Sequence, residues 1–204
     1  MSLTFRMTDE LVALIVFALV STGSPGGATS LATASGAKFG YARSVPLIAG
    51  IALTLGGLVA LSGTGLAALI LAVPSLAIGM KAVGTLYLLW LAVIIVKAGA
   101  PTDKNVKNAK PIGFFAGAML LAINPKAWAM AVGVASSFSG LSDNPYVLAG
   151  VYAAVFVSAA TLSLSLWAAV GLALSRMLRK DQHWHLFNVA MAALLILSIA
   201  SLWI

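Results

Sequence analysis

Long apolar stretches alternate with short polar segments along the whole chain. The long stretches without Asp, Glu, Lys, Arg or His are 11–37, 44–80, 82–96, 111–125, 127–142, 144–175 and 186–204. A membrane-spanning helix needs about 20 apolar residues, and each stretch reaches that length or does so once a single lysine is admitted. The pattern therefore predicts six helices, over about 9–36, 44–66, 76–97, 112–138, 145–173 and 185–204.

Turn-forming and polar residues mark the expected connections between these helices. Ser62–Gly65 and Pro74 bracket the second connection, and Asn144-Pro145 opens the fifth helix. The only long polar linker runs from Pro101 to Pro111, and it divides the chain into two units of three helices. We expect a first repeat over 1–100, a linker over 101–111 and a second repeat over 112–204.

The composition excludes a soluble protein. Hydrophobic residues make up 61% of the chain and charged residues 8%, with a mean hydropathy of +1.05. Soluble domains carry about 25% charged residues, so this chain lacks the polar surface that a soluble enzyme needs. It contains no cysteine, which excludes disulfides and thiolate metal sites.

The net charge of +7 predicts membrane orientation rather than a nucleic-acid partner. Nine basic residues fall on one side of the six-helix topology: Lys38, Arg43, Lys97, Lys104, Lys107, Lys110, Arg176, Arg179 and Lys180. The opposite side, which receives both termini, has only Arg6. Basic loops face the cytoplasm, so we expect both termini to face away from the cytoplasm.

The two units share a pattern of prolines at an offset near 100 residues. Ser24-Pro25-Gly26-Gly27 lies inside the first helix, and Asn124-Pro125-Lys126-Ala127 lies inside the fourth. Pro46 and Pro145 lie at the starts of the second and fifth helices. Because three is odd, the second unit must be inserted upside down. The expected fold is an all-α membrane protein with six spans in a 3+3 inverted repeat, as in many secondary transporters.

The two internal prolines predict broken helices. Ser24 and Asn124 are good N-cap residues, and each precedes a proline suited to the first helical position. A new half-helix should begin at each break, with free N–H groups and a partial positive charge that favour an anion. Inversion would bring both starts to one central site. The alternative is a pair of structural kinks, since prolines are tolerated in membrane helices.

Lys126 is the basic residue deepest within a predicted span. A charge there costs on the order of 2.5–3.5 kcal/mol, and no acidic residue lies in the core of any span to pair with it. It is therefore a candidate ligand for a substrate carboxylate. The alternatives are a neutral lysine or one that reaches a water-filled cavity. Lys81, nearer a helix end, fits substrate binding and snorkelling to the interface equally well.

Five segments carry a resemblance to a known family. They are Ser24–Gly27, Gly36 with Phe39-Gly40, Gly50–Leu53, Lys81–Leu91 and Ile123–Ala131. Together they resemble the lysine exporter and homoserine/threonine resistance (LysE/RhtB) family over nearly the whole chain. The resemblance implies six plasma-membrane helices and export of amino acids or related compounds. One departure is that the family's usual Pro-Gly-Pro-Asn is here Pro25-Gly26-Gly27-Ala28, which lacks the amide.

The sequence therefore predicts a secondary exporter of small carboxylate-bearing metabolites, and not an enzyme. Its expected substrate-binding residues are Ser24, Pro25, Gly26, Gly27, Asn124, Pro125, Lys126 and Ala127, with Lys81 and Tyr87 as further candidates. The expected partners are a small-molecule substrate and the lipid bilayer, without a cofactor or metal. A non-transporting accessory subunit that retains the family fold is the alternative. A metal-cation carrier would need carboxylate or histidine ligands in the core. The sequence places none there, which argues against this function.

Overall fold

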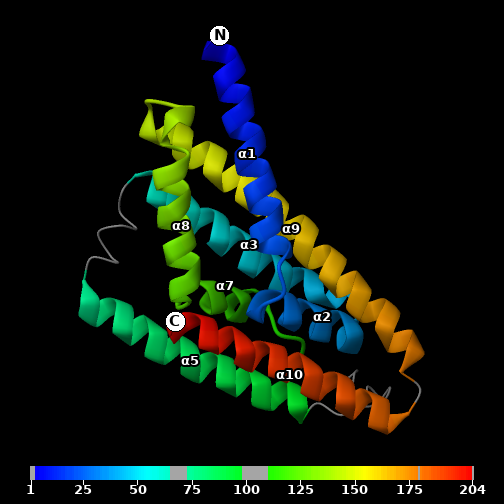
Figure 1. Cartoon of the computed structure of the whole chain (residues 1–204). Coiled ribbons are helices and arrows are strands. Elements are labelled where there is room, and N and C mark those ends of the chain that lie inside the picture. Colours follow the sequence, from blue (N-terminus) through cyan, green and yellow to red (C-terminus); the bar gives the residue numbers. More distant parts are fainter. Residues whose placement is uncertain (1–2, 65–72, 98–109, 179, 204) are drawn as a thin grey trace.

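The computed structural model describes residues 3–64, 73–97, 110–178 and 180–203 (Figure 1). These residues form helices and contain no strand. The helices are α1 (Leu3–Gly23), α2 (Gly27–Phe39), α3 (Tyr41–Gly63), α5 (Pro74–Val96), α7 (Phe114–Ala122), α8 (Pro125–Ser137), the short 3₁₀ helix η1 (Ser139–Leu141), α9 (Pro145–Met177) and α10 (Asp181–Trp203).

Each predicted helix has a counterpart, and the first and fourth are both broken. The axis turns by 60° between Thr8–Gly23 and Gly27–Phe39, and by 65° between Phe114–Ala122 and Ala127–Ser137. In the described residues, α3 and α9 are each long and apolar enough to span a membrane, and counting each bent pair as one span gives four. The six spans and their inverted repeat stay a prediction.

Local capping explains where α9 begins. Pro145 occupies the first turn, where its missing N–H removes no helical hydrogen bond. The Asn144 side-chain oxygen accepts hydrogen bonds from the N–H groups of Tyr146 at 2.9 Å and Val147 at 3.4 Å. Asn144 is thus the N-cap of the longest helix in the described structure.

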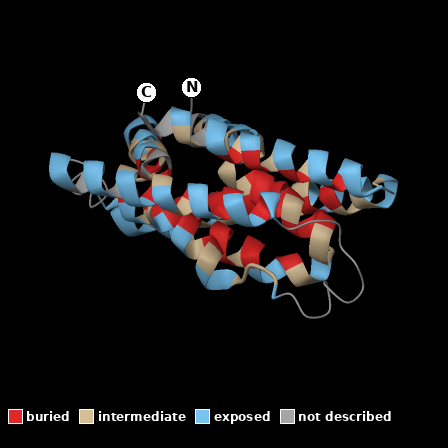
Figure 2. Ribbon diagram, turned by 90° about the horizontal axis from the view of Figure 1, so that it is seen from below, coloured by how far each residue is buried: buried red, intermediate tan, exposed pale blue. Residues whose placement is uncertain are grey.

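Helices α3 and α9 pack against each other at the centre of the fold. Helices α1 and α2 pack on α9, while α7 and α8 pack on α3. Helices α5 and α10 run side by side along one edge, and α10 also packs on α2 (Figure 1). Buried residues are concentrated between these layers, as Figure 2 shows.

Glycines let two of these helix pairs approach closely. A Cβ atom on Gly36 of α2 would collide with the Ala168 carbonyl of α9, and one on Gly50 of α3 would collide with the Phe114 carbonyl of α7. Small residues at such crossings are typical of helices packed within a membrane. They bring one half of each broken helix, α2 and α7, close to the central pair.

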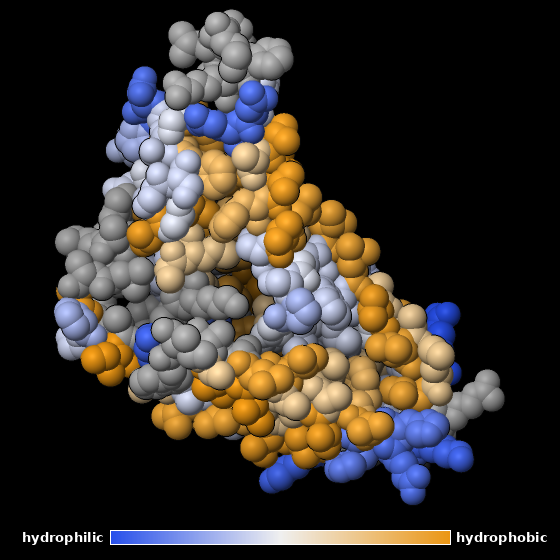
Figure 3. All heavy atoms as spheres, viewed as in Figure 1, coloured by the Kyte–Doolittle hydropathy of each residue, from blue (hydrophilic) through white to orange (hydrophobic). Residues whose placement is uncertain are grey.

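The outer faces of the helices are apolar. Val20, Leu86 and Leu166 are among the large hydrophobic side chains that the fold leaves exposed. Figure 3 shows orange, hydrophobic residues along the right edge and the lower part of the face, and the most hydrophilic residues towards its top and lower right. A surface of this kind suits contact with lipid rather than with water.

The ends of α2, α5 and α9 lie near the start of α10, towards the lower right of Figure 1. We call this region the basic end. Its described basic residues are Lys38, Arg43, Lys97, Lys110, Arg176 and Lys180. All six belong to the group that the sequence predicts to share one side of the membrane. Arg179, Lys104 and Lys107 lie outside the described residues.

Candidate functional site

At the first break, Ser24 closes α1 and does not cap α2. Its N–H donates to the Val20 carbonyl at 3.1 Å, and its hydroxyl donates to the Ser21 carbonyl at 2.9 Å. Two residues lie between Ser24 and the start of α2 at Gly27. The prediction of an N-cap at Ser24 is therefore wrong, because the hydroxyl is directed back to the helix that ends there.

The side-chain hydrogen bonds at the start of α2 come from Thr29, the third residue of the helix. The N-cap residue is Gly26, in a fully extended conformation. The Thr29 hydroxyl accepts a hydrogen bond from the Gly26 N–H at 2.7 Å and donates one to the Gly26 carbonyl at 3.0 Å. The first helical hydrogen bond runs from the Ser30 N–H to the Gly26 carbonyl. This leaves the N–H groups of Gly27, Ala28 and Thr29 in the first turn of α2, where a helix supplies no acceptor of its own.

The carbonyls released at the end of α1 are satisfied by α9. The Ser163 hydroxyl donates to the Thr22 carbonyl at 2.7 Å, and the Trp167 indole N–H donates to the Gly23 carbonyl at 3.2 Å. A buried carbonyl without a partner would be costly. These hydrogen bonds from α9 therefore lower the free-energy cost of interrupting the first helix.

At the second break, a carbonyl at the end of the first half-helix is likewise satisfied by a side chain, which here comes from the second half-helix. The Trp128 indole N–H, on α8, donates to the carbonyl of Ala122, the last residue of α7, at 2.8 Å. Asn124 precedes α8, and its carbonyl accepts from the Ala127 N–H at 3.0 Å. Ala127 is one of the expected substrate-binding residues, but its N–H already donates a hydrogen bond within the protein.

We expect Trp128→Phe to destabilise the protein. The indole is buried, and phenylalanine would leave the Ala122 carbonyl without its donor, at a cost of about 1–3 kcal/mol. Trp90→Phe is the matched control, because Trp90 is 55% exposed on the outer face of α5. Thermal unfolding in detergent should show a lower midpoint for the Trp128 variant alone. Equal midpoints for both variants would contradict this role of Trp128.

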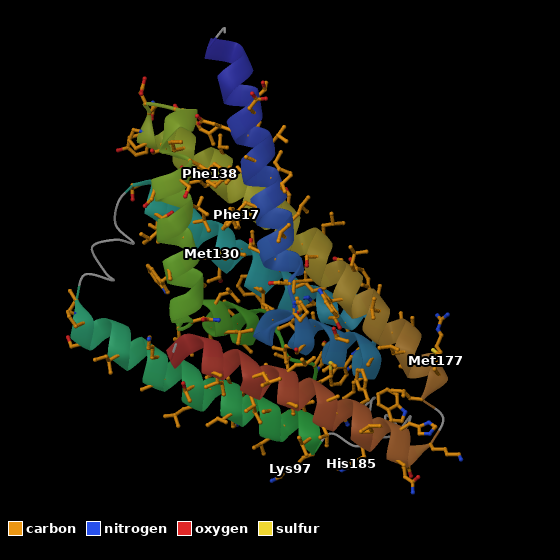
Figure 4. All side chains as sticks on the ribbon, viewed as in Figure 1. Phe17, Lys97, Met130, Phe138, Met177 and His185 are labelled. Atoms are coloured by element: carbon orange, nitrogen blue, oxygen red, sulfur yellow. The ribbon has the colours of Figure 1, made fainter. Side chains whose placement is uncertain are left out.

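Both breaks line one cavity of about 120 Å³ at the centre of the fold. We call it the central cavity. Its described lining residues are Ser21, Thr22, Ser24, Pro25, Gly26, Gly27, Ala28, Thr29, Ile51, Leu55, Leu121, Asn124, Ala127, Met130, Ala160 and Leu164. Met130, labelled in Figure 4, lies on the side of α8 that faces α1. Six of the eight expected substrate-binding residues therefore lie together.

The other expected site residues are placed differently. Pro125 and Lys126 form the first turn of α8, and their side chains lie outside the described part of the structure. Lys81 and Tyr87, on α5, are not among the described residues that line the central cavity. The Tyr87 hydroxyl instead donates to the Ala116 carbonyl at 2.8 Å, which ties α5 to α7.

The central cavity offers both signs of partial charge. The carboxyl end of α1 and the amino end of α2 meet at the first break, and helix ends carry partial negative and partial positive charge respectively. Hydroxyls add acceptor positions near α1, since Ser21 and Thr22 both direct their protons to the Ala18 carbonyl. The remaining wall is apolar, from Ile51, Leu55 and residues of α7–α9.

An aromatic cluster lies between the central cavity and the N-terminal end of α1. Phe17 of α1 lies 6.1 Å from Phe138 and 6.5 Å from Phe156, between ring centroids. Phe156 precedes Ala160, a lining residue, by one helical turn on the buried face of α9. Figure 4 shows Phe17 and Phe138 between α1 and α8. The rings therefore stand between the cavity and that end of the bundle.

Beyond this cluster lies a buried acidic group that the sequence did not indicate. One carboxylate oxygen of Glu10 is buried, has no hydrogen-bond partner among the described residues, and lies against Gly140 of η1. The buried Tyr152 hydroxyl also has no partner within the part of the chain that the structure describes. From the sequence, Glu10 is expected only to lie at the membrane surface, at the start of the first helix. No three acidic or histidine side chains gather into a metal-binding group in the described part of the chain.

A comparison with protein families gives one match, which covers nearly the whole chain. A family model described as LysE type translocator matches residues 19–202. No curated protein and no solved structure matches the chain. The matched range includes both breaks and every described residue that lines the central cavity.

Proposed function

We propose, from the premise that this chain belongs to the LysE type translocator family, that it exports amino acids or related small carboxylate-bearing metabolites. Membership of that family, together with the apolar helices, makes the chain a multi-pass membrane protein that transports small molecules and is not an enzyme. The substrate class, the direction of transport and the secondary mechanism are our proposals.

The observation that carries the proposal is the meeting of both helix breaks in one cavity. A zwitterionic substrate would place its carboxylate at the N–H groups of Gly27 and Ala28, where the partial charge of α2 is positive. Its ammonium group would lie towards the hydroxyls and carboxyl end of α1. A volume of about 120 Å³ is below the roughly 300–1,000 Å³ of pockets for drug-sized ligands, which favours a small metabolite.

Lys126 is proposed to add a full positive charge to the carboxylate subsite. Its backbone lies in the first turn of α8, between Pro125 and Ala127 in the chain. Because the Ala127 N–H already donates to Asn124, the second break has fewer backbone donors than the first. A charged side chain at this position would compensate for that difference.

The packing supports an inverted repeat as the basis of alternating access. Both halves of the first broken helix, α1 and α2, pack on α9, and both halves of the second, α7 and α8, pack on α3. A twofold axis that exchanges the two units would also pair α3 with α9 and α5 with α10, as observed. We propose that the two units rock against each other around the central cavity.

We expect both termini to face the periplasm of a bacterial inner membrane. The described residues of the basic end would then lie in the cytoplasm, as the positive-inside rule requires. An alkaline phosphatase fusion at Ile204 should be active, and a fusion of the same enzyme at Lys104 should be inactive. The reverse pattern would refute this orientation and the direction of transport that depends on it.

Counterflow in proteoliposomes tests the proposed function. Vesicles loaded with one unlabelled amino acid at a time should accumulate the same amino acid, labelled, faster than empty vesicles with the same protein. We expect such exchange for at least one member of the standard set. Two results together would refute transport and favour a non-transporting accessory subunit. They are the absence of exchange for every amino acid and short peptide tested, and unchanged growth of the host when Asn124 is replaced with alanine.

A further inference from the structure

A second cavity, of about 110 Å³, lies at the basic end of the molecule. It is formed where α2, α5 and α10 meet the segment that leads into α7. Its polar lining residues are Lys38, Lys110, Ser35 and Asn188. We call it the basic-end cavity. It shares no described lining residue with the central cavity, so the proposed transport site does not account for it.

The apolar part of the basic-end cavity continues onto the outer surface of the bundle. Leu31, Ile95 and Ile112 form its inner wall, while Ile94 is 38% exposed on α5. The neighbouring outward residues of α5, Trp90 and Val93, are also exposed and apolar. The cavity is thus bounded by a surface that a bilayer would cover.

Positive charge is concentrated at the mouth of the same cavity. Phe39 is a lining residue, and its ring is approached by the Lys38 ammonium at 5.4 Å and the Arg43 guanidinium at 5.3 Å. These cation–π contacts hold two cations on one ring. Lys110 approaches from the segment before α7, and none of the described lining residues is acidic.

We propose that the basic-end cavity binds an anionic phospholipid. The phosphate would lie between Lys38 and Lys110, on the side of the cavity that Asn188 lines. One acyl chain would follow the apolar wall at Ile94 towards the outer face of α5. Positive pockets between membrane helices suit such headgroups. The basic residues would face the phosphate, and the apolar wall beside them would face the acyl chain.

The position of Trp184 supports an ordered site at this depth. Its indole N–H donates to the Leu178 carbonyl at 2.8 Å, and its ring packs edge-on against Phe187. Trp184 is buried and lines the cavity. Tryptophan is enriched where headgroups meet acyl chains, which is where the proposed lipid would change from phosphate to hydrocarbon.

Native mass spectrometry of the full chain in detergent tests this proposal. Phosphatidylglycerol and phosphatidylcholine with identical acyl chains are added in equal amounts, and bound lipid is counted. We expect one phosphatidylglycerol retained in preference to phosphatidylcholine. The double variant Lys38→Gln/Lys110→Gln should lose that preference by roughly fivefold for each lysine removed. Lys38→Arg/Lys110→Arg, which keeps both charges, should retain it.

The matched control is Lys97→Gln/Lys180→Gln, which removes two exposed lysines of the basic end that do not line the cavity. Figure 4 shows Lys97 at this end of α5. Equal loss in the control and the cavity variant would overturn the site in favour of non-specific attraction. Displacement of the lipid by soluble glycerol phosphate, or equal retention of both lipids by the wild type, would also overturn it.

Discussion

Gly26→Leu is expected to abolish transport while the protein remains folded. A Cβ atom on Gly26 would have no heavy atom within 4 Å, and its φ of −178° is an extended conformation that any residue adopts. Gly26 lines the central cavity, so the larger side chain would occupy space needed by the substrate. Overfilling a site costs about 1–3 kcal/mol, which corresponds to a fall of roughly fivefold to 150-fold in affinity.

Gly133→Leu is the control for this variant. Gly133 also has no heavy atom near its Cβ position, but it is exposed on α8 and does not line the central cavity. Counterflow is measured per unit of folded protein, which gel filtration in detergent quantifies. Normal exchange by the Gly26 variant would show that the substrate does not use this cavity.

Lys126→Met is the second large effect that we expect. Methionine keeps length and apolar bulk but removes the charge, so membrane insertion should become easier. Exchange should fall by about tenfold or more, because a hydrogen bond to a charged group is worth about 1.5–3 kcal/mol. Lys126→Arg should also be impaired, since a planar fork does not replace a compact ammonium.

Lys97→Met provides the comparison for Lys126, because Lys97 is exposed at the end of α5. It removes the same charge at the basic end, away from the central cavity. Efflux per unit of inserted protein should be close to wild type for Lys97→Met. If Lys126→Met also exports at the wild-type rate, the lysine has no role in carboxylate binding and is a tolerated structural residue.

The helix pattern and both breaks could be predicted because their causes are local. Apolar length fixes where a span can lie, and a proline inside an apolar run marks where a helix is interrupted. The structure has helices at the predicted places, with breaks at Ser24–Gly26 and before Pro125. The ends differ by a few residues, as for the last helix, which begins at Asp181 rather than near 185.

The details of the site depend on contacts that the sequence does not display. Ser24 and Thr29 are both reasonable capping residues, and only the conformation of Gly26 selects Thr29. The carbonyls at the first break are satisfied by Ser163 and Trp167, which lie far along the chain on α9. The burial of Glu10 against η1 likewise requires the packed bundle.

The central claim is that the two breaks form a single substrate site. The chain contains no cysteine, so single-cysteine variants report on one position each. Ser24→Cys and Asn124→Cys place a thiol on opposite walls of the central cavity, and Ser136→Cys places one on an exposed part of α8. The rate of modification by a small methanethiosulfonate reagent is measured with each standard amino acid present in turn.

We predict that any amino acid exchanged in counterflow slows modification at Ser24→Cys and Asn124→Cys with the same half-maximal concentration. Ser136→Cys should react at an unchanged rate. Protection of only one of the two cavity thiols, or different half-maximal concentrations for the two, would contradict a single site between the helix breaks.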